Sequence, residues 1–206
     1  MKKVLIIVMA AIVFGVLAVG VGGCGSYNGM VSRKQEVDRS WAQVDTQYQR
    51  RYDLVPNLVK TVEGSANFER SVLKEVTEAR ASVGQLKMTP GQAPETAEEF
   101  AKFQAAQGQL ASAVSRLLVV SEKYPDLKAS AGFRDLQVQI EGTENRIAVA
   151  RHDFNTAVQS YNTSVQQFPG VVVARLGGFM PRPYFQSDAA AQKAPAVEFN
   201  FGTPAK

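Results

Sequence analysis

The stretch FRDLQVQIEGTENRIAVARHDFNTAVQSYNTSVQQF, residues 133–168, decides the fold class. Its mostly apolar seam advances in alternating steps of three and four residues, and ten steps cover 35 residues. The seam positions are Phe133, Leu136, Ile140, Thr143, Ile147, Ala150, Phe154, Ala157 or Val158, Tyr161, Val165 and Phe168. A repeat of 3.5 residues is typical of long helices whose side chains interlock. The stretch is therefore predicted to form one long helix of a bundle.

Three earlier stretches carry the same repeat, at residues 27–55, 58–86 and 100–124. A proline-rich turn at residues 88–94 separates the second from the third, and Pro125 separates the third from the fourth. Thr96 and Glu99 have the spacing of a capping box, which predicts that a helix begins there. Because alternation typical of strands is nearly absent, we predict an all-α fold in which residues 25–170 form a long antiparallel four-helix bundle.

Three details of this bundle have two interpretations each. Pro56 either kinks one long helix or occupies the first turn of a new one. Either Asp126 or Ser130 caps the fourth helix. Ser65 and Glu69 interrupt the apolar repeat of the second stretch, where they either form a buried polar site that fixes the register or face solvent.

The N-terminal residues 1–24 are predicted to be a membrane anchor or a lipoprotein signal peptide. The run at residues 4–23, VLIIVMAAIVFGVLAVGVGG, contains no polar or charged side chain and follows Lys2 and Lys3. Twenty helical residues span roughly 30 Å, the thickness of the hydrocarbon core of a bilayer. Small residues before Cys24 fit a lipobox in which Cys24 is lipidated, whereas a run longer than 7–15 residues favours an uncleaved transmembrane anchor. Both alternatives tether the chain to membrane lipid.

The C-terminal residues 171–206 differ in character from the bundle. The segment VVVARLGGFM, residues 171–180, is expected to form one or two helical turns. Its apolar side chains are expected to be shielded from water. The end of the bundle, the membrane or another copy of the chain could shield them. The remainder, rich in proline and alanine, is predicted to be a flexible tail.

Composition and charge argue against several classes of protein. The 206 residues include 23 Lys and Arg against 19 Asp and Glu, for a net charge of +4. Acids and bases are interspersed, so no nucleic-acid partner is expected. One cysteine and one histidine argue against a disulfide framework and against a zinc site built from these residues.

Candidate catalytic residues have simpler structural explanations. His152 lies between Arg151 and Asp153, which is typical of an exposed helix face. Glu141 and Glu144 share a helix face, and arginines interleave with them, so salt bridges are expected in place of a carboxylate site. We therefore expect no catalytic residue, metal or cofactor, and predict that the protein is not an enzyme.

The most informative polar cluster contains Arg50, Arg51, Asp53 and Asn57. One interpretation is a helix junction in which the arginines pair with acids of a neighbouring helix. The other is a docking patch for a partner protein or for lipid phosphates. Trp41 falls in the apolar seam, which predicts a core position.

Short sequence blocks lie along residues 27–185 in a fixed order: YNGMV (27–31), WAQV (41–44), YQRRYDLVPNLV (48–59), VTEAR (76–80), SRLLVVSEKYP (115–125), FRDLQ (133–137), EGTENRIAVAR (141–151) and AVQSYN (157–162). Through these blocks the chain resembles the LemA family of bacterial membrane proteins. It implies an N-terminal membrane segment followed by a long antiparallel helical bundle, and it implies no activity, cofactor or catalytic residue. Members with a cysteine just before the Tyr-Asn opening resemble lipoproteins. Residues 64–69, GSANFE, depart from the family, which commonly has a tyrosine and a histidine there.

These observations favour a non-enzymatic, membrane-tethered scaffold or assembly module of the bacterial cell envelope, with the domain exported rather than cytoplasmic. Long amphipathic helices associate readily, so a homo-oligomer is expected. The alternative is an adaptor that docks another, unidentified envelope protein, such as a membrane protease. Its contact would be the tail or the region of Arg50 and Arg51.

Overall fold

The computed structural model describes residues 2–65, 68–86 and 92–186, with side chains for Met9 and from residue 23 onward. These residues form helices and no strand, so the predicted all-α fold class is confirmed. The helices are α1 (Lys2–Glu63), α2 (Arg70–Gly84), α3 (Ala97–Ser121), α4 (Pro125–Ala129), α5 (Ala131–Gln166) and α6 (Gly170–Gly177).

The first helix is longer than the sequence pattern suggests. α1 has 62 residues and continues through Pro56, so the first interpretation of this proline, one long helix, is confirmed. Val55, Leu58 and Val62 are all buried, which holds the helix together across the missing proline N–H. The apolar stretch at residues 58–86 is therefore divided between the end of α1 and α2.

The polar gap in the second stretch is the connection between α1 and α2. α1 ends at Glu63, and Glu69 has an extended backbone and precedes α2. Glu69 is exposed, and its carboxylate lies 3.6 Å from the Lys123 ammonium. The interpretation of a buried polar site that fixes register is wrong at this position. Such a site exists elsewhere in the body, as described below.

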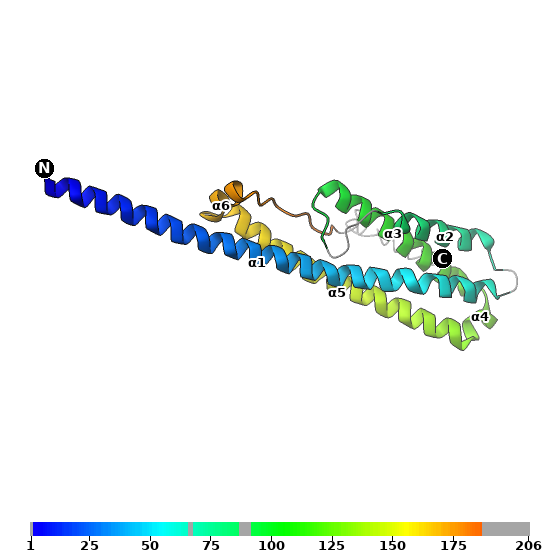
Figure 1. Cartoon of the computed structure of the whole chain (residues 1–206). Coiled ribbons are helices and arrows are strands. Elements are labelled where there is room, and N and C mark those ends of the chain that lie inside the picture. Colours follow the sequence, from blue (N-terminus) through cyan, green and yellow to red (C-terminus); the bar gives the residue numbers. More distant parts are fainter. Residues whose placement is uncertain (1, 66–67, 87–91, 187–206) are drawn as a thin grey trace, which may run out of the picture.

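The helices run up and down along one long axis (Figure 1). α1 and α5 are antiparallel and pack along each other, while α2 packs on α3 and also touches α1. α6 lies against α1 and α5 at the end where α5 finishes. The N-terminal part of α1 projects beyond all the other helices.

Two helix starts agree with the sequence. The Thr96 hydroxyl accepts a hydrogen bond from the Glu99 N–H, and the Glu99 carboxylate accepts one from the Thr96 N–H, so the capping box is confirmed. Ser130 caps α5 by accepting from the Phe133 N–H at 3.2 Å. Asp126 lies instead in α4, a five-residue helix that the sequence pattern did not predict.

Two apolar clusters fill the body. The near core, on the side of the projecting end of α1, includes Met30, Val37, Trp41, Val44, Tyr48, Phe100, Phe103, Ile147, Phe154, Tyr161 and Phe185. The far core includes Val55, Leu58, Val62, Val72, Val76, Leu110, Val114, Leu117, Phe133 and Ile140. The predicted core position of Trp41 is confirmed.

The membrane anchor stays a prediction. Within the part of the chain that was searched, no helix combines the length and the apolar character needed to cross a bilayer. The backbone of residues 4–23 belongs to α1, but their side chains, except Met9, lie outside the described residues. The C-terminal residues 187–206 also lie outside them.

Replacing Gly170 by alanine is expected to displace α6. A Cβ at Gly170 would collide with the Ser164 carbonyl oxygen and lie 2.9 Å from the Met30 methyl group. Overpacking of this kind costs about 1–3 kcal/mol, measurable by chemical denaturation. Gly108→Ala is the matched control, because nothing lies near its Cβ and alanine favours the helix by up to about 1 kcal/mol. Equal stability of the two variants would contradict the packing described for α6.

Candidate functional site

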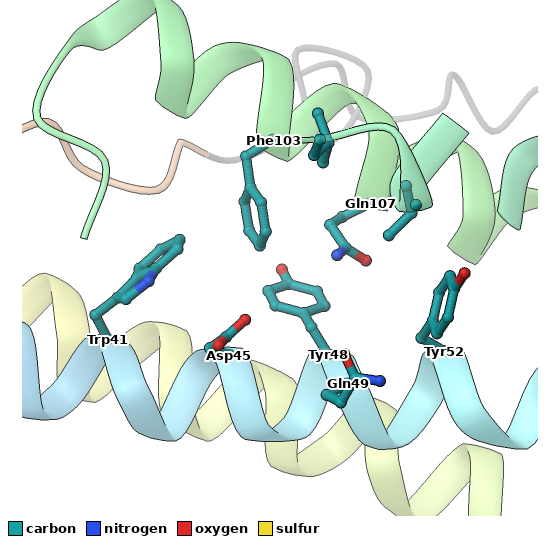
Figure 2. A pocket seen from close by; sticks show the side chains of 10 residues that line it. Trp41, Asp45, Tyr48, Gln49, Tyr52, Phe103 and Gln107 are labelled. Atoms are coloured by element: carbon teal, nitrogen blue, oxygen red, sulfur yellow. The ribbon is translucent and has the colours of Figure 1, made fainter. Parts of the chain in front are cut away.

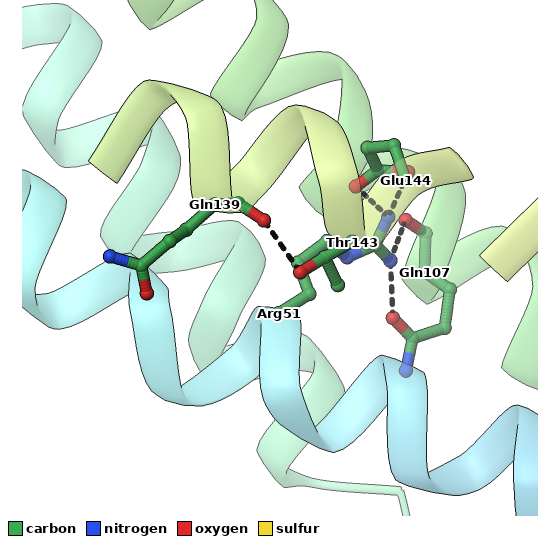
Figure 3. Close-up of polar contacts among 5 residues, drawn as sticks. All are labelled: Arg51, Gln107, Gln139, Thr143 and Glu144. Atoms are coloured by element: carbon green, nitrogen blue, oxygen red, sulfur yellow. Dashed lines mark hydrogen bonds and ion pairs between the residues drawn. The ribbon is translucent and has the colours of Figure 1, made fainter. Parts of the chain in front are cut away.

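A buried arginine joins three helices at the centre of the body. Arg51 of α1 is 2% exposed. Its Nη1 donates to both Glu144 carboxylate oxygens in α5, at 2.9 and 3.2 Å. Its Nη2 donates to the main-chain and side-chain oxygens of Gln107 in α3, at 2.9 and 2.5 Å (Figure 3). The guanidinium also lies 5.1 Å from the centre of the Tyr48 ring.

This contact forms a polar layer between the two cores. Along α1, Arg51 separates Tyr48 of the near core from Val55 of the far core. Gln107 likewise lies between the near-core and far-core residues of α3, and Thr143 and Glu144 lie between those of α5. The two terminal nitrogens of Arg51 take their acceptors from α3 and α5, whereas its buried Nε has no hydrogen-bond partner. A helix that slipped by one turn would therefore leave the charge unpaired. The layer therefore fixes the register of α1, α3 and α5.

The structure divides the four docking candidates between the interior and the surface. Arg51 points inward, and the interpretation that it pairs with an acid of a neighbouring helix is confirmed. Arg50, Asp53 and Asn57 are exposed. Asp53 accepts a hydrogen bond from Gln49 at 2.9 Å. Docking at this face stays a prediction, and a partner there would meet the three exposed residues and not the Arg51 guanidinium.

A cleft of about 310 Å³ opens beside the near core, between α1, α3 and the end of α2 (Figure 2). Its walls are Trp41, Asp45, Tyr48, Gln49, Tyr52, Val83, Gly84, Leu86, Phe103 and Gln107. Burial raises the pKa of the half-buried Asp45 carboxyl above its ordinary value. Burial also raises the pKa of the Tyr48 hydroxyl, against the opposing effect of the Arg151 and Arg51 charges. The cleft offers aromatic faces and one carboxyl, which suits a small ligand with an apolar ring.

The remaining candidate catalytic groups lie in separate environments. Glu144 is bound to Arg51, and Glu141 accepts a hydrogen bond from Gln137. His152 is exposed on the surface of α5. The searched part of the chain holds no group of three or more His, Cys, Asp or Glu residues that could bind a metal ion.

Residues 181–186, which we call the strap, correct the prediction of a flexible tail. They run in a non-helical course from α6 toward α3 (Figure 1). The Phe185 side chain packs in the near core. Sequence periodicity missed the strap because it has no repeat of its own. The available signals were the pair Arg182 and Phe185 inside a proline-rich segment and the asparagines Asn155 and Asn162, seven residues apart on α5.

The end of the body next to the projecting part of α1 carries an apolar surface. The predicted helical turns at residues 171–180 are confirmed as α6, whose Ala174 is buried against the body. Side chains on the outer side of α6 and its flanks stay exposed, with Leu176 at 86%. These side chains, the α6 patch, are Phe168, Val172, Leu176 and Met180. Cys24 is also exposed on α1.

Comparison with known proteins gives a consistent set of matches. The pattern of the LemA family matches residues 40–199. Magnetosome proteins MamQ 2 and MamQ 1 of Paramagnetospirillum magneticum are each 26% identical over 180 residues, covering 80% of this chain and 66% of the relative. Protein LemA of Metamycoplasma hominis is 22% identical over 160 residues, covering 76% of this chain and 68% of the relative. The chain thus spans just under two thirds of the length of the MamQ relatives.

Replacing Arg51 by alanine is expected to lower the free energy of unfolding by about 3 kcal/mol, because Gln107 and Glu144 lose their shared partner. Arg50→Ala is the matched control and is expected to change it by less than about 0.5 kcal/mol, since Arg50 is exposed. Urea denaturation followed by circular dichroism measures both. Similar losses in the two variants would contradict the role of the polar layer.

Asp45→Asn is expected to stabilise the protein at neutral pH. Because the pKa of Asp45 is raised in the folded state, folding favours the protonated carboxyl, and Asp45 costs stability as the pH rises through that pKa. Solvent screens a half-exposed group, so the gain at pH 7 is about 0.5 kcal/mol or less. It should vanish at a pH low enough to protonate Asp45 in both states. Denaturation midpoints across pH 3–7 measure this, and a loss of stability at pH 7 would refute it.

Proposed function

This chain belongs to the LemA family, and we propose that it is a non-enzymatic, membrane-tethered scaffold of the bacterial cell envelope whose helices α1, α2, α3 and α5 act as one antiparallel four-helix bundle. The domain is exported, and its tether is the apolar run at residues 4–23. The tether either stays as a transmembrane anchor or is replaced by acyl chains on Cys24.

The continuity of α1 carries this proposal. One helix includes the apolar run, passes the near core, contains Arg51 of the polar layer and ends beyond the far core. At 1.5 Å per residue, residues 24–63 extend for about 60 Å. A body built along such a rod keeps a fixed orientation to its tether, which suits a structural element better than a mobile domain on a flexible linker.

The position of the α6 patch is a second observation that supports the proposed membrane tether. α6 packs on α1, and its neighbour Phe179 contacts Tyr27, four residues after the apolar run, with ring centres 5.3 Å apart. The exposed Leu176 and Met180 therefore lie beside the point where α1 would leave the bilayer. An apolar helix face at that level fits the interfacial zone of a membrane.

The proposal that the protein is not an enzyme is supported by the separate positions of its candidate catalytic groups. Glu144 binds Arg51 of the polar layer, and the exposed His152 does not contribute to the cleft. The cleft contains a single carboxyl, Asp45, among aromatic and amide side chains. Two tyrosines also line the cleft, and burial raises the pKa of the Tyr48 hydroxyl above its ordinary value, so this group stays protonated at neutral pH.

An adaptor role is the second candidate. It is favoured by the exposed face of α1 that carries Arg50, Asp53 and Asn57, which are three and four residues apart and so lie on one side of the helix. A partner with complementary charges, such as another envelope protein, would dock there. Because this face is outside the polar layer, changing it should leave the fold intact.

The tether is tested by placing two charges in the apolar run. Ile12→Lys with Leu17→Lys is expected to move the protein from the membrane fraction to the soluble fraction, because charged groups are costly in the hydrocarbon core. The unchanged protein should resist extraction from membranes by alkaline carbonate. Unchanged protein in the soluble fraction would refute the proposal.

Intact mass spectrometry of the membrane-extracted chain then distinguishes the two tethers. A transmembrane anchor gives the full-length mass of 22.4 kDa. A lipoprotein gives a mass that lacks residues 1–23 and includes acyl chains.

A further inference from the structure

The strap is held in the way that proteins hold an extended peptide. Asn162 donates to the main-chain oxygen of Arg182 at 2.9 Å and accepts from the N–H of the same residue at 2.8 Å. Asn155 makes the same pair of bonds with Phe185, at 3.1 and 2.9 Å. Gln104 of α3 makes the pair with Gln186, at 2.9 and 3.5 Å.

Such amide pairs recognise main chain. A carboxamide has one acceptor and one donor side, so it satisfies both polar groups of one extended residue without contacting its side chain. Three pairs from α3 and α5 define a groove that accepts an extended segment in one register. In peptide recognition generally, main-chain bonds provide affinity and side-chain pockets provide specificity.

The groove also has two side-chain pockets. Phe185 is 6% exposed, and its ring centre lies 4.7 Å from that of Phe100 and 5.5 Å from that of Phe154. Arg182 is 8% exposed and donates to the Glu95 carboxylate at 2.7 Å. Tyr184, between them, is 40% exposed. The groove therefore recognises an arginine and, three residues later, a phenylalanine.

The strap is connected to the body through a glycine hinge. Gly178 ends α6 with a φ of +72°, a conformation that other residues rarely adopt, and Gly177 precedes it. Pro181 follows, so no helix continues into the strap. A strap that swings out at this hinge exposes Phe185 and leaves its groove empty. The strap of another copy has the same sequence and therefore fits the empty groove. Exchange of identical segments is a low-cost route to association.

We propose that the groove between α3 and α5 is a peptide-binding site whose ligand in trans is the strap of a second copy of this chain. Within one copy, the short connection gives the strap an effective concentration on the order of millimolar, so a dilute chain keeps its own strap. Copies confined to one membrane meet at high local concentration, and exchange then links neighbours. This inference rests on the proposed tether for its setting, although the exchange itself requires only the groove and the strap.

The test uses the full chain with a photo-crosslinking amino acid, benzoylphenylalanine, in place of Tyr184, which lies over the groove beside Gln104. This chain carries a size tag and is mixed in vesicles with an untagged chain. Illumination is expected to give a tagged–untagged adduct whose crosslink maps to residues 97–112 of the untagged copy. Arg182→Ala in the tagged chain should lower the yield at least tenfold.

Two controls make the outcome decisive. Benzoylphenylalanine at Val138, an exposed position on α5, tests for random collisions in a crowded membrane. Phe185→Ala is a second strap variant, and circular dichroism checks that both strap variants stay helical. Adducts found only within one copy, or equal yields from position 138, would overturn the exchange. Neither outcome affects the tether, which is measured separately by membrane extraction.

Discussion

The structure depends on the burial of one charged side chain, the Arg51 guanidinium. An arginine out of contact with water must be paired, and Arg51 finds its partners on two other helices, Gln107 in α3 and Glu144 in α5. The two apolar cores would each tolerate small shifts along the helix axes, since apolar contacts are not directional. The polar layer removes that freedom because only one alignment brings acceptors from α3 and α5 to the two terminal nitrogens of the guanidinium.

Because the register is fixed, the features along α1 have fixed positions relative to the other helices. With the register fixed at Arg51, the near core, α6 and the strap all come together at the end of the body next to the projecting N-terminal part of α1. The contacts proposed for the membrane, through the α6 patch, and for a second copy, through the strap, belong to this one end. The exposed face with Arg50, the docking site proposed for the adaptor role, is separate from this end.

Much of the body could be predicted from the sequence because its helices depend on local signals. The 3.5-residue repeat, the capping box at Thr96 and the core position of Trp41 were all predicted correctly. The start of α2 was missed because Pro56 is an ambiguous break and the apolar repeat continues past it. For Arg51, pairing with an acid of a neighbouring helix was one of two interpretations, but local patterns could not identify that acid as Glu144, 93 residues away. The strap was missed because its partners are distant in the sequence, such as Asn162, 20 residues from Arg182.

The claim that Arg51 fixes the register is tested most directly by a distance between α1 and α5. Spin labels at the exposed positions 46 and 149, in a Cys24→Ser background, report that distance by double electron–electron resonance. One narrow distribution is expected in this chain, and a broadened or shifted one is expected after Arg51→Met, which nearly keeps the volume of the side chain but removes the charge. An unchanged narrow distribution in the Arg51→Met chain would contradict the central role of the polar layer.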